Sequence, residues 1–115
     1  MSAITTHVLD TAQGRPAAGV AIVLERQDDD GDGWTRLGDG KTDDDGRLRT
    51  LLKPDHALQP GTYRIEFDTG AYFAASGTKG FYPRVQVAFT ITAPDEHYHV
   101  PLLLNPYGYS TYRGS

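Results

Sequence analysis

Short runs of alternating apolar and polar residues, separated by Gly, Pro and Asp, are the feature that most constrains this chain. In the run GTYRIEFD, over 61–68, Tyr63, Ile65 and Phe67 fall on one side of an extended backbone and the charged residues fall on the other. Such alternation is typical of a strand with one face buried and one face in water. The run over 84–92 repeats the pattern, so the sequence predicts sheet over most of its length.

Six further runs predict the remaining strands, and only the segment DTGAYFAASG has a helical pattern. In it, Asp68 or Thr69 can cap a helix whose two turns cover 71–76 and which ends at Gly77. Many short strands with turn residues between them are typical of a β-sandwich. We therefore expect residues 1–115 to form a single all-β domain of two sheets with one short helix. The further strands are expected at 4–10, 20–27, 34–42, 47–51, 97–105 and 109–114, the last two forming a hairpin.

Composition excludes several classes of function. The net charge of −4 provides no electrostatic footprint for nucleic acid, and no apolar stretch is long enough for a membrane span. Without cysteine there is no disulfide, zinc–thiolate site or thiol nucleophile. The opening MSAITTHVLD lacks a basic segment followed by an apolar run, so we expect no signal peptide and a cytoplasmic location.

Two Asp-rich segments raise the question of a metal site. In DDDGDG, Asp28, Asp30 and Asp32 match the start of an EF-hand calcium loop, and Asp39 falls at the twelfth position. The flanking runs are strands, whereas an EF-hand needs helices, and the twelfth position lacks the usual bidentate Glu. We interpret this segment as a solvated hairpin turn and the 43–46 segment in the same way, and we expect no metal and no cofactor.

The histidines offer a better candidate for chemistry. His97 and His99 lie on one face of their strand, opposite the residues that enter the core, and His7 faces outward from the first strand. Apolar neighbours on that outward face indicate an interface or a pocket. The two imidazoles of His7 and His99 are candidates for acid–base chemistry near neutral pH, and ordinary packing is the alternative. The outward set is His7, Leu9, His99, Pro101 and Leu103.

The final residues share this pattern, because Ser110 and Tyr112 alternate with Thr111 and Arg113. If the last two strands pair, Ser110 and Tyr112 stand on the face of His99. A Ser–His nucleophile is conceivable, but no Asp orients it, and attack by water with histidine as base needs fewer assumptions. As an edge strand, this segment also has unpaired backbone groups with which a second copy of the chain can pair.

Three segments together carry a specific resemblance. HVLDTAQGRPA (7–17), TDDDGRL (42–48) and HYHVPLLLNPYGYSTYRGS (97–115) resemble the transthyretin-like 5-hydroxyisourate hydrolases, with YRGS as the family hallmark. The resemblance implies a transthyretin-like (prealbumin-like) β-sandwich of two four-stranded sheets, with one short helix after the fifth strand. It also implies a homotetramer with a central channel where two dimers meet, and the outward set of residues, together with Ser110 and Tyr112, would form the channel wall.

The resemblance also assigns residues and a reaction. It places the catalytic histidines at His7 and His99 and the substrate-binding arginine at Arg47. The substrate is 5-hydroxyisourate, which water opens at a ring amide to give 2-oxo-4-hydroxy-4-carboxy-5-ureidoimidazoline in urate catabolism. Asn105, where the family often has Ser, is a departure in a turn. The substrate-binding set is completed by the C-terminal residues Ser110, Tyr112, Arg113 and Ser115, with Gly114 in the same motif.

Two other classes of function remain open at this point. A non-catalytic carrier would bind a small aromatic ligand in the same channel, although such a carrier needs less His and Arg than this wall contains. A plain adhesion or sugar-binding sandwich would be a monomer with an inert C-terminal segment.

Overall fold

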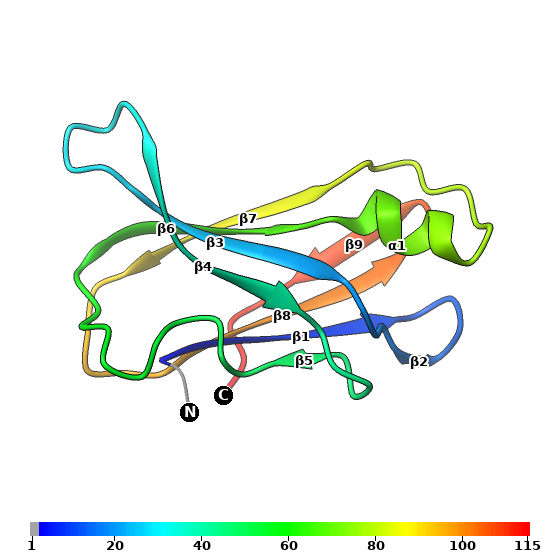
Figure 1. Cartoon of the computed structure of the whole chain (residues 1–115), viewed down its shortest axis with the longest axis horizontal. Helices are drawn as coiled ribbons and strands as arrows, with labels where there is room; N and C mark the ends of the chain where they lie inside the picture. Colours follow the sequence, from blue (N-terminus) through cyan, green and yellow to red (C-terminus); the bar gives the residue numbers. More distant parts are fainter. Residues whose placement is uncertain (1–2) are drawn as a thin grey trace.

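The computed structural model describes residues 3–115 and consists of two β-sheets packed face to face, with one helix at an end (Figure 1). The first sheet is antiparallel and has the strand order β4–β3–β6–β7. The hairpin of β3 and β4 extends beyond the sandwich at its Asp-rich turn. The four strands are β3 (Ala21–Gln27), β4 (Trp34–Lys41), β6 (Gly61–Phe67) and β7 (Val85–Ile91).

The second sheet has the order β2–β1–β8–β9, and β5 also pairs with β1. The two short strands β2 and β5 meet different parts of β1, where Leu9 pairs with Pro16 and His7 pairs with Arg47. Because this edge is divided, the sheet has five strands where the resemblance implied four, and the helix follows the sixth strand. The strands are β1 (Ile4–Asp10), β2 (Arg15–Pro16), β5 (Arg47–Leu48), β8 (Tyr98–Asn105) and β9 (Gly108–Thr111).

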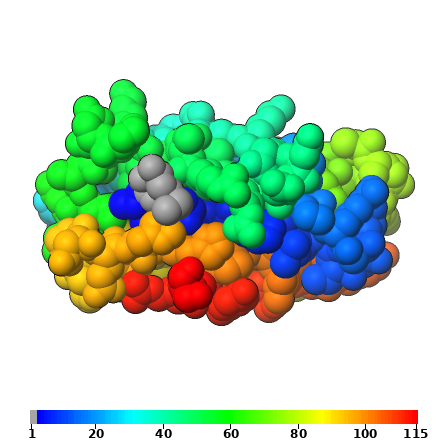
Figure 2. Space-filling model, turned by 90° about the horizontal axis from the view of Figure 1, so that it is seen from below, coloured from blue at the N-terminus to red at the C-terminus, as the bar shows by residue number. Residues whose placement is uncertain are grey.

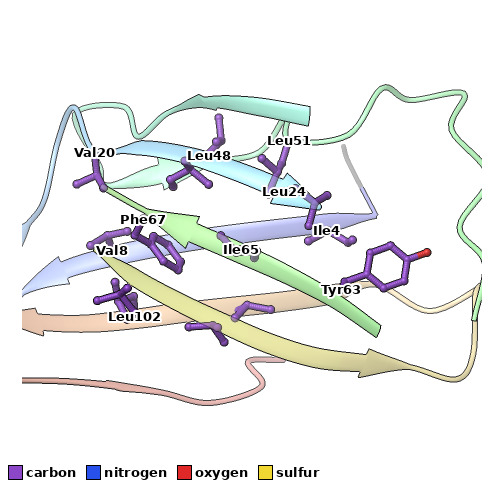
Figure 3. Close-up of a cluster of buried hydrophobic side chains, with 14 of the residues drawn as sticks. Ile4, Val8, Val20, Leu24, Leu48, Leu51, Tyr63, Ile65, Phe67 and Leu102 are labelled. Atoms are coloured by element: carbon purple, nitrogen blue, oxygen red, sulfur yellow. The ribbon is translucent and has the colours of Figure 1, made fainter. Parts of the chain in front are cut away.

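The core fills the space between the sheets (Figure 3). Tyr63, Ile65 and Phe67 are fully buried there, as the alternation over 61–68 predicted. Val8 and Leu102 meet them from the second sheet. Burying a side chain of this size stabilises a fold by roughly 1.5–3 kcal/mol, so these inward faces fix which face of each sheet is left outward.

The helix α1 (Thr69–Ala75) begins two residues earlier than the sequence predicted. The Asp68 side chain accepts a hydrogen bond from the Ala71 N–H at 3.2 Å and so caps the first turn. The Tyr72 hydroxyl donates to the buried Asp10 carboxylate at 2.7 Å, which joins the helix to the end of β1. Over residues 3–115, no helix is long and apolar enough to cross a membrane.

Two predicted strands are shorter than expected. The strand predicted over 47–51 ends at Leu48, and Leu51 and Leu52 are both buried. Both leucines reach the core from the irregular segment that follows β5. The last predicted strand ends at Thr111, with one isolated bridge between Gly114 and His99 beyond it.

The DDDGDG segment forms the hairpin turn that the sequence predicted between β3 and β4. The N–H of Asp28 donates to the Gly33 carbonyl at 2.8 Å, and the Thr35 hydroxyl donates to the Asp28 carboxylate at 2.6 Å. Arg26 forms an ion pair with Asp29 at 3.1 Å. The acidic side chains therefore serve the turn itself.

Candidate active site

The outward face of the second sheet arranges its side chains in rows across the strands. Arg47, His7 and Pro101 are direct neighbours in one row, because β1 pairs with β5 on one side and with β8 on the other. Since β1 and β8 are parallel and in register, Thr5 lies beside His99 in the next row. Adjacent strands are separated by about 4.8 Å, so the two catalytic candidates His7 and His99 are diagonal neighbours.

Figure 2 looks onto this face, where residues around 45–50 (green), β1 (blue), β8 (orange) and the C-terminal segment (red) lie as successive bands. Segments from the whole length of the chain therefore meet here. The pairing of β1 with β5 and β8 accounts for the first three bands, and the bridge between His99 and Gly114 accounts for the last.

Arg47 reaches its row because of the Asp-Gly turn before β5. The Asp43 side chain accepts hydrogen bonds from the N–H groups of Asp45 and Arg47, at 2.9 and 3.0 Å. Gly46 has φ of +75°, and its carbonyl accepts the Val8 N–H at 2.7 Å. A Cβ at Gly46 would collide with the Val8 carbonyl oxygen, so only glycine allows the turn to lie this close to β1.

These elements enclose a pocket of about 270 Å³ on the outward face. Its polar lining combines imidazole, guanidinium and hydroxyl groups, which is a wall suited to a polar, flat or anionic ligand. Among residues 3–115, no group of three or more His, Cys, Asp or Glu side chains could hold a metal ion. The pocket is lined by Thr5, Thr6, Arg47, Arg49, His97, His99 and Ser115.

Both catalytic candidates are held toward their neutral forms. Burial lowers the pKa of His99 below its usual 6.5, and the charges of Arg47, His97 and His7 lower it further. Burial and the charge of Arg47 also lower the pKa of His7, although a backbone hydrogen bond with Asp45 acts in the opposite direction. A neutral imidazole in a cationic pocket can accept a proton from water.

Thr5, His97 and Arg49 belong to the pocket but were missing from the predicted site. The Thr5 hydroxyl lies 2.8 Å from Nδ1 of His99 and 3.0 Å from Nε2 of His97. A signal existed for each: Thr5 shares the strand face of His7, and His97 shares that of His99. Arg49 follows Arg47 by two residues, and its guanidinium lies 3.4 Å from the Asp43 carboxylate.

The C-terminal segment reaches the pocket through its last two residues. Ser115 lines the pocket, and the Gly114 N–H donates to the His99 carbonyl at 2.8 Å. A Cβ at Gly114 would lie 2.6 Å from Cδ2 of His99, so the absent side chain lets the backbone lie directly against the imidazole. Of the predicted C-terminal binding residues, Ser115 is thus brought to the histidines.

Arg113 lies elsewhere in the single chain. Its guanidinium packs 4.4 Å from the centre of the Tyr98 ring and forms a 2.9 Å ion pair with Glu96. It also donates to the His97 carbonyl at 3.3 Å. Tyr98 is on the inward face of β8, so Arg113 is on the face opposite His99, which is where strand alternation placed it. Its predicted contact with substrate stays a prediction.

Ser110 and Tyr112 are near the site without lining it. Ser110 pairs directly with Leu103 in the β8–β9 hairpin and therefore shares the outward face. Tyr112 follows the end of β9, is exposed, and borders a separate pocket with Arg113 and residues of β7. Their predicted roles in binding substrate stay predictions.

Comparison with known proteins agrees with this geometry. Residues 4–114 match the model of the HIUase/Transthyretin family. A 5-hydroxyisourate hydrolase of Salmonella dublin is 51% identical over 112 residues, covering 97% of this chain and 80% of that protein. The 5-hydroxyisourate hydrolase of Mus musculus is 48% identical over 99% of this chain and 96% of its own length.

Solved structures resemble this one over nearly its full length. The 5-hydroxyisourate hydrolase of Klebsiella pneumoniae has a TM-score of 0.83 at 38% identity, covering 97% of this chain and 92% of that chain. Sea bream transthyretin, in a complex with thyroxine, has a TM-score of 0.89 at 34% identity, covering 98% of this chain and 95% of that chain. The fold is thus common to a 5-hydroxyisourate hydrolase and to a transthyretin that binds thyroxine, and the side chains of the site must distinguish them.

Proposed function

This chain belongs to the HIUase/transthyretin family, and we propose that it is a 5-hydroxyisourate hydrolase whose active site is the pocket on the outward face of β1, β5 and β8. The observation that carries the proposal is the placement of His7, Arg47 and His99 on one face of the sheet. Arg47 and His99 line the pocket, and His7 pairs directly with Arg47 without lining it. Relatives with the name of this hydrolase cover nearly the whole chain, which supports the enzyme over the carrier.

Arg47 is suited to bind the substrate. 5-Hydroxyisourate is a flat, polar ring, and a planar guanidinium can donate two parallel hydrogen bonds to ring oxygens. When water attacks a ring carbonyl, negative charge develops on the carbonyl oxygen, and a fixed cation beside it lowers the barrier. Arg49 lines the same pocket and adds to its positive potential.

His7 and His99 are suited to move the protons. One neutral imidazole accepts a proton as the water oxygen bonds to the ring carbonyl carbon. The carbon–nitrogen bond of the amide then breaks, and the nitrogen leaves with a proton returned by an imidazolium. Water is the nucleophile and no redox change occurs, so the reaction needs only these proton transfers and no cofactor.

We extend the proposal to a homotetramer with the pocket in a central channel. The C-terminal edge supports this assembly, because β9 is the outermost strand of its sheet and exposed edges readily pair with another copy. Several large aromatic side chains near this edge are exposed, which is unusual for a free surface. They are Phe81, Tyr82, Tyr107, Tyr109 and Tyr112.

In the tetramer, Ser110, Tyr112 and Ser115 would contact substrate from the channel wall. Arg113 would help by holding the C-terminal segment, since its contacts with Tyr98 and Glu96 keep the following two residues against His99. A cytoplasmic location is part of the same proposal, supported by a composition without cysteine that needs no oxidising compartment.

The test is ultraviolet spectroscopy of freshly made 5-hydroxyisourate with and without the protein. We expect faster decay than the spontaneous reaction and an optically active product. The variants His7→Ala and His99→Ala should each lose at least about 100-fold in rate, while His56→Ala, a histidine in an exposed loop, should match the wild type. Decay at the spontaneous rate with wild-type protein would reject the proposed function.

Assembly is tested separately by measuring the molecular mass in solution. A mass four times that of the 12.6 kDa chain is expected. A monomer would instead support a plain sandwich with an inert C-terminal segment.

A further inference from the structure

The hydroxyl of Thr5 lies between two imidazoles. Its Oγ1 is 2.8 Å from Nδ1 of His99 and 3.0 Å from Nε2 of His97. Thr5 is buried, and the two rings lie nearly parallel with centres 6.4 Å apart. A hydroxyl carries one hydrogen, so Thr5 can donate to only one of these nitrogens, and the other ring must donate to Thr5.

Two arrangements of the protons satisfy both hydrogen bonds of Thr5 with the imidazoles. In the first, Nδ1–H of His99 donates to Thr5, and Thr5 donates to Nε2 of His97; Nε2 of neutral His99 is then bare and can accept a proton. In the second, Nε2–H of His97 donates to Thr5, and Thr5 donates to Nδ1 of His99; neutral His99 then carries its proton on Nε2. The first arrangement makes His99 a base toward the pocket, and the second makes it a donor.

The fold keeps the three groups in line. Thr5 and His99 are direct neighbours in the parallel pairing of β1 and β8, and His97 comes two residues before His99. The carbonyl of His97 accepts a hydrogen bond from Arg113, which is anchored on Tyr98 and Glu96. These contacts fix the backbone positions from which the two imidazoles extend toward the hydroxyl.

Resting on the proposed function, we propose that Thr5 and His97 are positioning residues that set the tautomer of His99 and carry its second proton. As Nε2 of His99 takes a proton from the attacking water, its Nδ1 proton passes to Thr5 and the Thr5 proton passes to Nε2 of His97. In the second half of the reaction, Nε2 of His99 gives its proton to the leaving nitrogen, Thr5 returns a proton to Nδ1 of His99, and His97 returns one to Thr5. One proton enters and one leaves, so the sequence balances.

The surrounding charges favour such a relay. Arg47, Arg49 and His7 face His99 from β5, the segment after it and β1, and cations there oppose a lasting positive charge on His99. Glu96 and Arg113 lie on the far side of His97. Passing the proton outward to His97 moves the charge away from the guanidinium of Arg47.

The test compares two substitutions at Thr5 in the full-length protein. Thr5→Val keeps the shape and the strand preference but removes the hydroxyl, and Thr5→Ser restores it. We expect Thr5→Val to lower kcat about 10- to 100-fold, a part of the usual acid–base contribution, with KM little changed and an altered pH profile. Thr5→Ser should recover most of the rate. Thr62→Val, on β6 of the other sheet, is the matched control and should behave as wild type.

His97 gives an independent test through the same path. His97→Phe keeps a ring but removes the bond to Thr5, and should lower kcat as Thr5→Val does. The double variant should be no worse than either single variant, because both remove one relay. In ¹⁵N-edited spectra of the histidine rings, the Nδ1–H and Nε2–H tautomers of His99 are distinguished directly, and Thr5→Val should change their ratio.

Three results would overturn the inference: wild-type kcat and pH profile in Thr5→Val, an equal loss in Thr5→Ser, or an unchanged His99 tautomer in Thr5→Val. The ¹⁵N-edited spectra test the His99 tautomer even if no variant of the protein turns over substrate. If wild type is active and His99→Ala is not, while Thr5→Val and His97→Phe behave as wild type, the relay fails and the proposed function stands. If wild type itself is inactive, the proposed function fails first.

Discussion

Two Asp-rich turns look alike in the sequence and do different work in the molecule. The segment 28–33 closes the β3–β4 hairpin and projects beyond the sandwich (Figure 1). The segment 43–46 precedes β5, lies against β1 and brings Arg47 beside His7. Both contain an Asp side chain that accepts backbone N–H groups and a glycine with positive φ. Local chemistry makes the turn, and the neighbouring strand decides whether the turn serves a site.

The glycines show the difference most directly. At Gly31, nothing lies within 4 Å of the position a Cβ would take, whereas at Gly46 a Cβ would meet the Val8 carbonyl and the side chain of Pro16. Gly31 is therefore required only by its backbone angle, and Gly46 is required by its angle and by close packing. The 43–46 turn packs against β1, whereas the 28–33 turn projects from the sandwich (Figure 1) without close packing at Gly31.

The largest expected difference in catalytic rate is between substitutions of the arginines that follow the two turns, Arg47 and Arg36. Arg47→Ala should reduce kcat/KM about 100- to 1,000-fold, the usual loss when a group that stabilises the developing oxyanion is removed. Arg36→Ala, on the exposed hairpin where Arg36 forms an ion pair with Asp39, should leave the rate unchanged. Steady-state kinetics on fresh 5-hydroxyisourate measure both. Equal rates for Arg47→Ala and Arg36→Ala would show that the 43–46 turn contributes no more to catalysis than the hairpin does.

The next effect concerns stability. Gly31→Ala should cost about 1–2 kcal/mol in the free energy of unfolding, the penalty of a left-handed conformation for an L-residue. Gly46→Ala should cost clearly more, because the methyl group must also displace β1, and should lower kcat through the shift of Arg47. Denaturant unfolding measures the free energy of unfolding of both variants, and the comparison holds if the dependence on denaturant concentration is unchanged. Similar losses in both variants would mean that the 43–46 turn is not tightly packed.

A smaller effect is expected at the aspartates. Hydrogen bonds from the backbone of Arg47 and Asp45, together with nearby Arg49 and Arg47, outweigh burial and lower the pKa of Asp43. Its folded pKa is below the unfolded value near 3.9, so its stabilisation is present above that pH and is lost as the pH falls through the folded pKa. Asp43→Asn should therefore flatten the acid end of the stability–pH curve, and Asp30→Asn should change it less. The same dependence of stability on pH in Asp43→Asn and Asp30→Asn would contradict this role of Asp43.

The smallest expected effect concerns the charge of Arg47, which the 43–46 turn places beside His7. Because Arg47 lowers the pKa of both His7 and His99, Arg47→Met should raise both pKa values part of the way toward 6.5. Burial, the first cause, remains, so the recovery is incomplete. Asp43→Asn should lower the pKa of His7, and Arg36→Met should leave both unchanged. Histidine titration by NMR measures all of these, and no shift in Arg47→Met would show that the guanidinium is too far away to matter.

Much of this architecture followed from strand alternation. The runs predicted at 4–10, 61–68, 84–92 and 97–105 contain the strands Ile4–Asp10, Gly61–Phe67, Val85–Ile91 and Tyr98–Asn105. Most of the apolar residues predicted to face the core are buried, and Phe89 is partly buried. Alternation also indicated that His7 and His99 face outward, and that Arg113 does not share their face. The placement of Arg47 in the site came from resemblance alone, because a two-residue strand has too short a pattern to indicate its partner.

Other features were outside the reach of a sequence pattern. Thr5 is one of many threonines in strands, and only its place between two imidazoles singles it out. The strand predicted over 47–51 ends at Leu48, and Leu51 and Leu52 turn into the core from the segment beyond it. Nothing in the sequence indicated that Arg113 would form an ion pair with Glu96 and pack on the ring of Tyr98, and its role in binding substrate stays a prediction.

By itself, the sequence determined which residues face inward and which face outward, because the period of a strand is local and burial of apolar side chains selects one face. Only the tertiary structure decided which outward residues meet. The parallel register of β1 and β8 and the packing of the 43–46 turn on Val8 join positions thirty-eight to ninety-four residues apart. Such pairings depend on the relative placement of whole strands, which no short stretch of sequence contains.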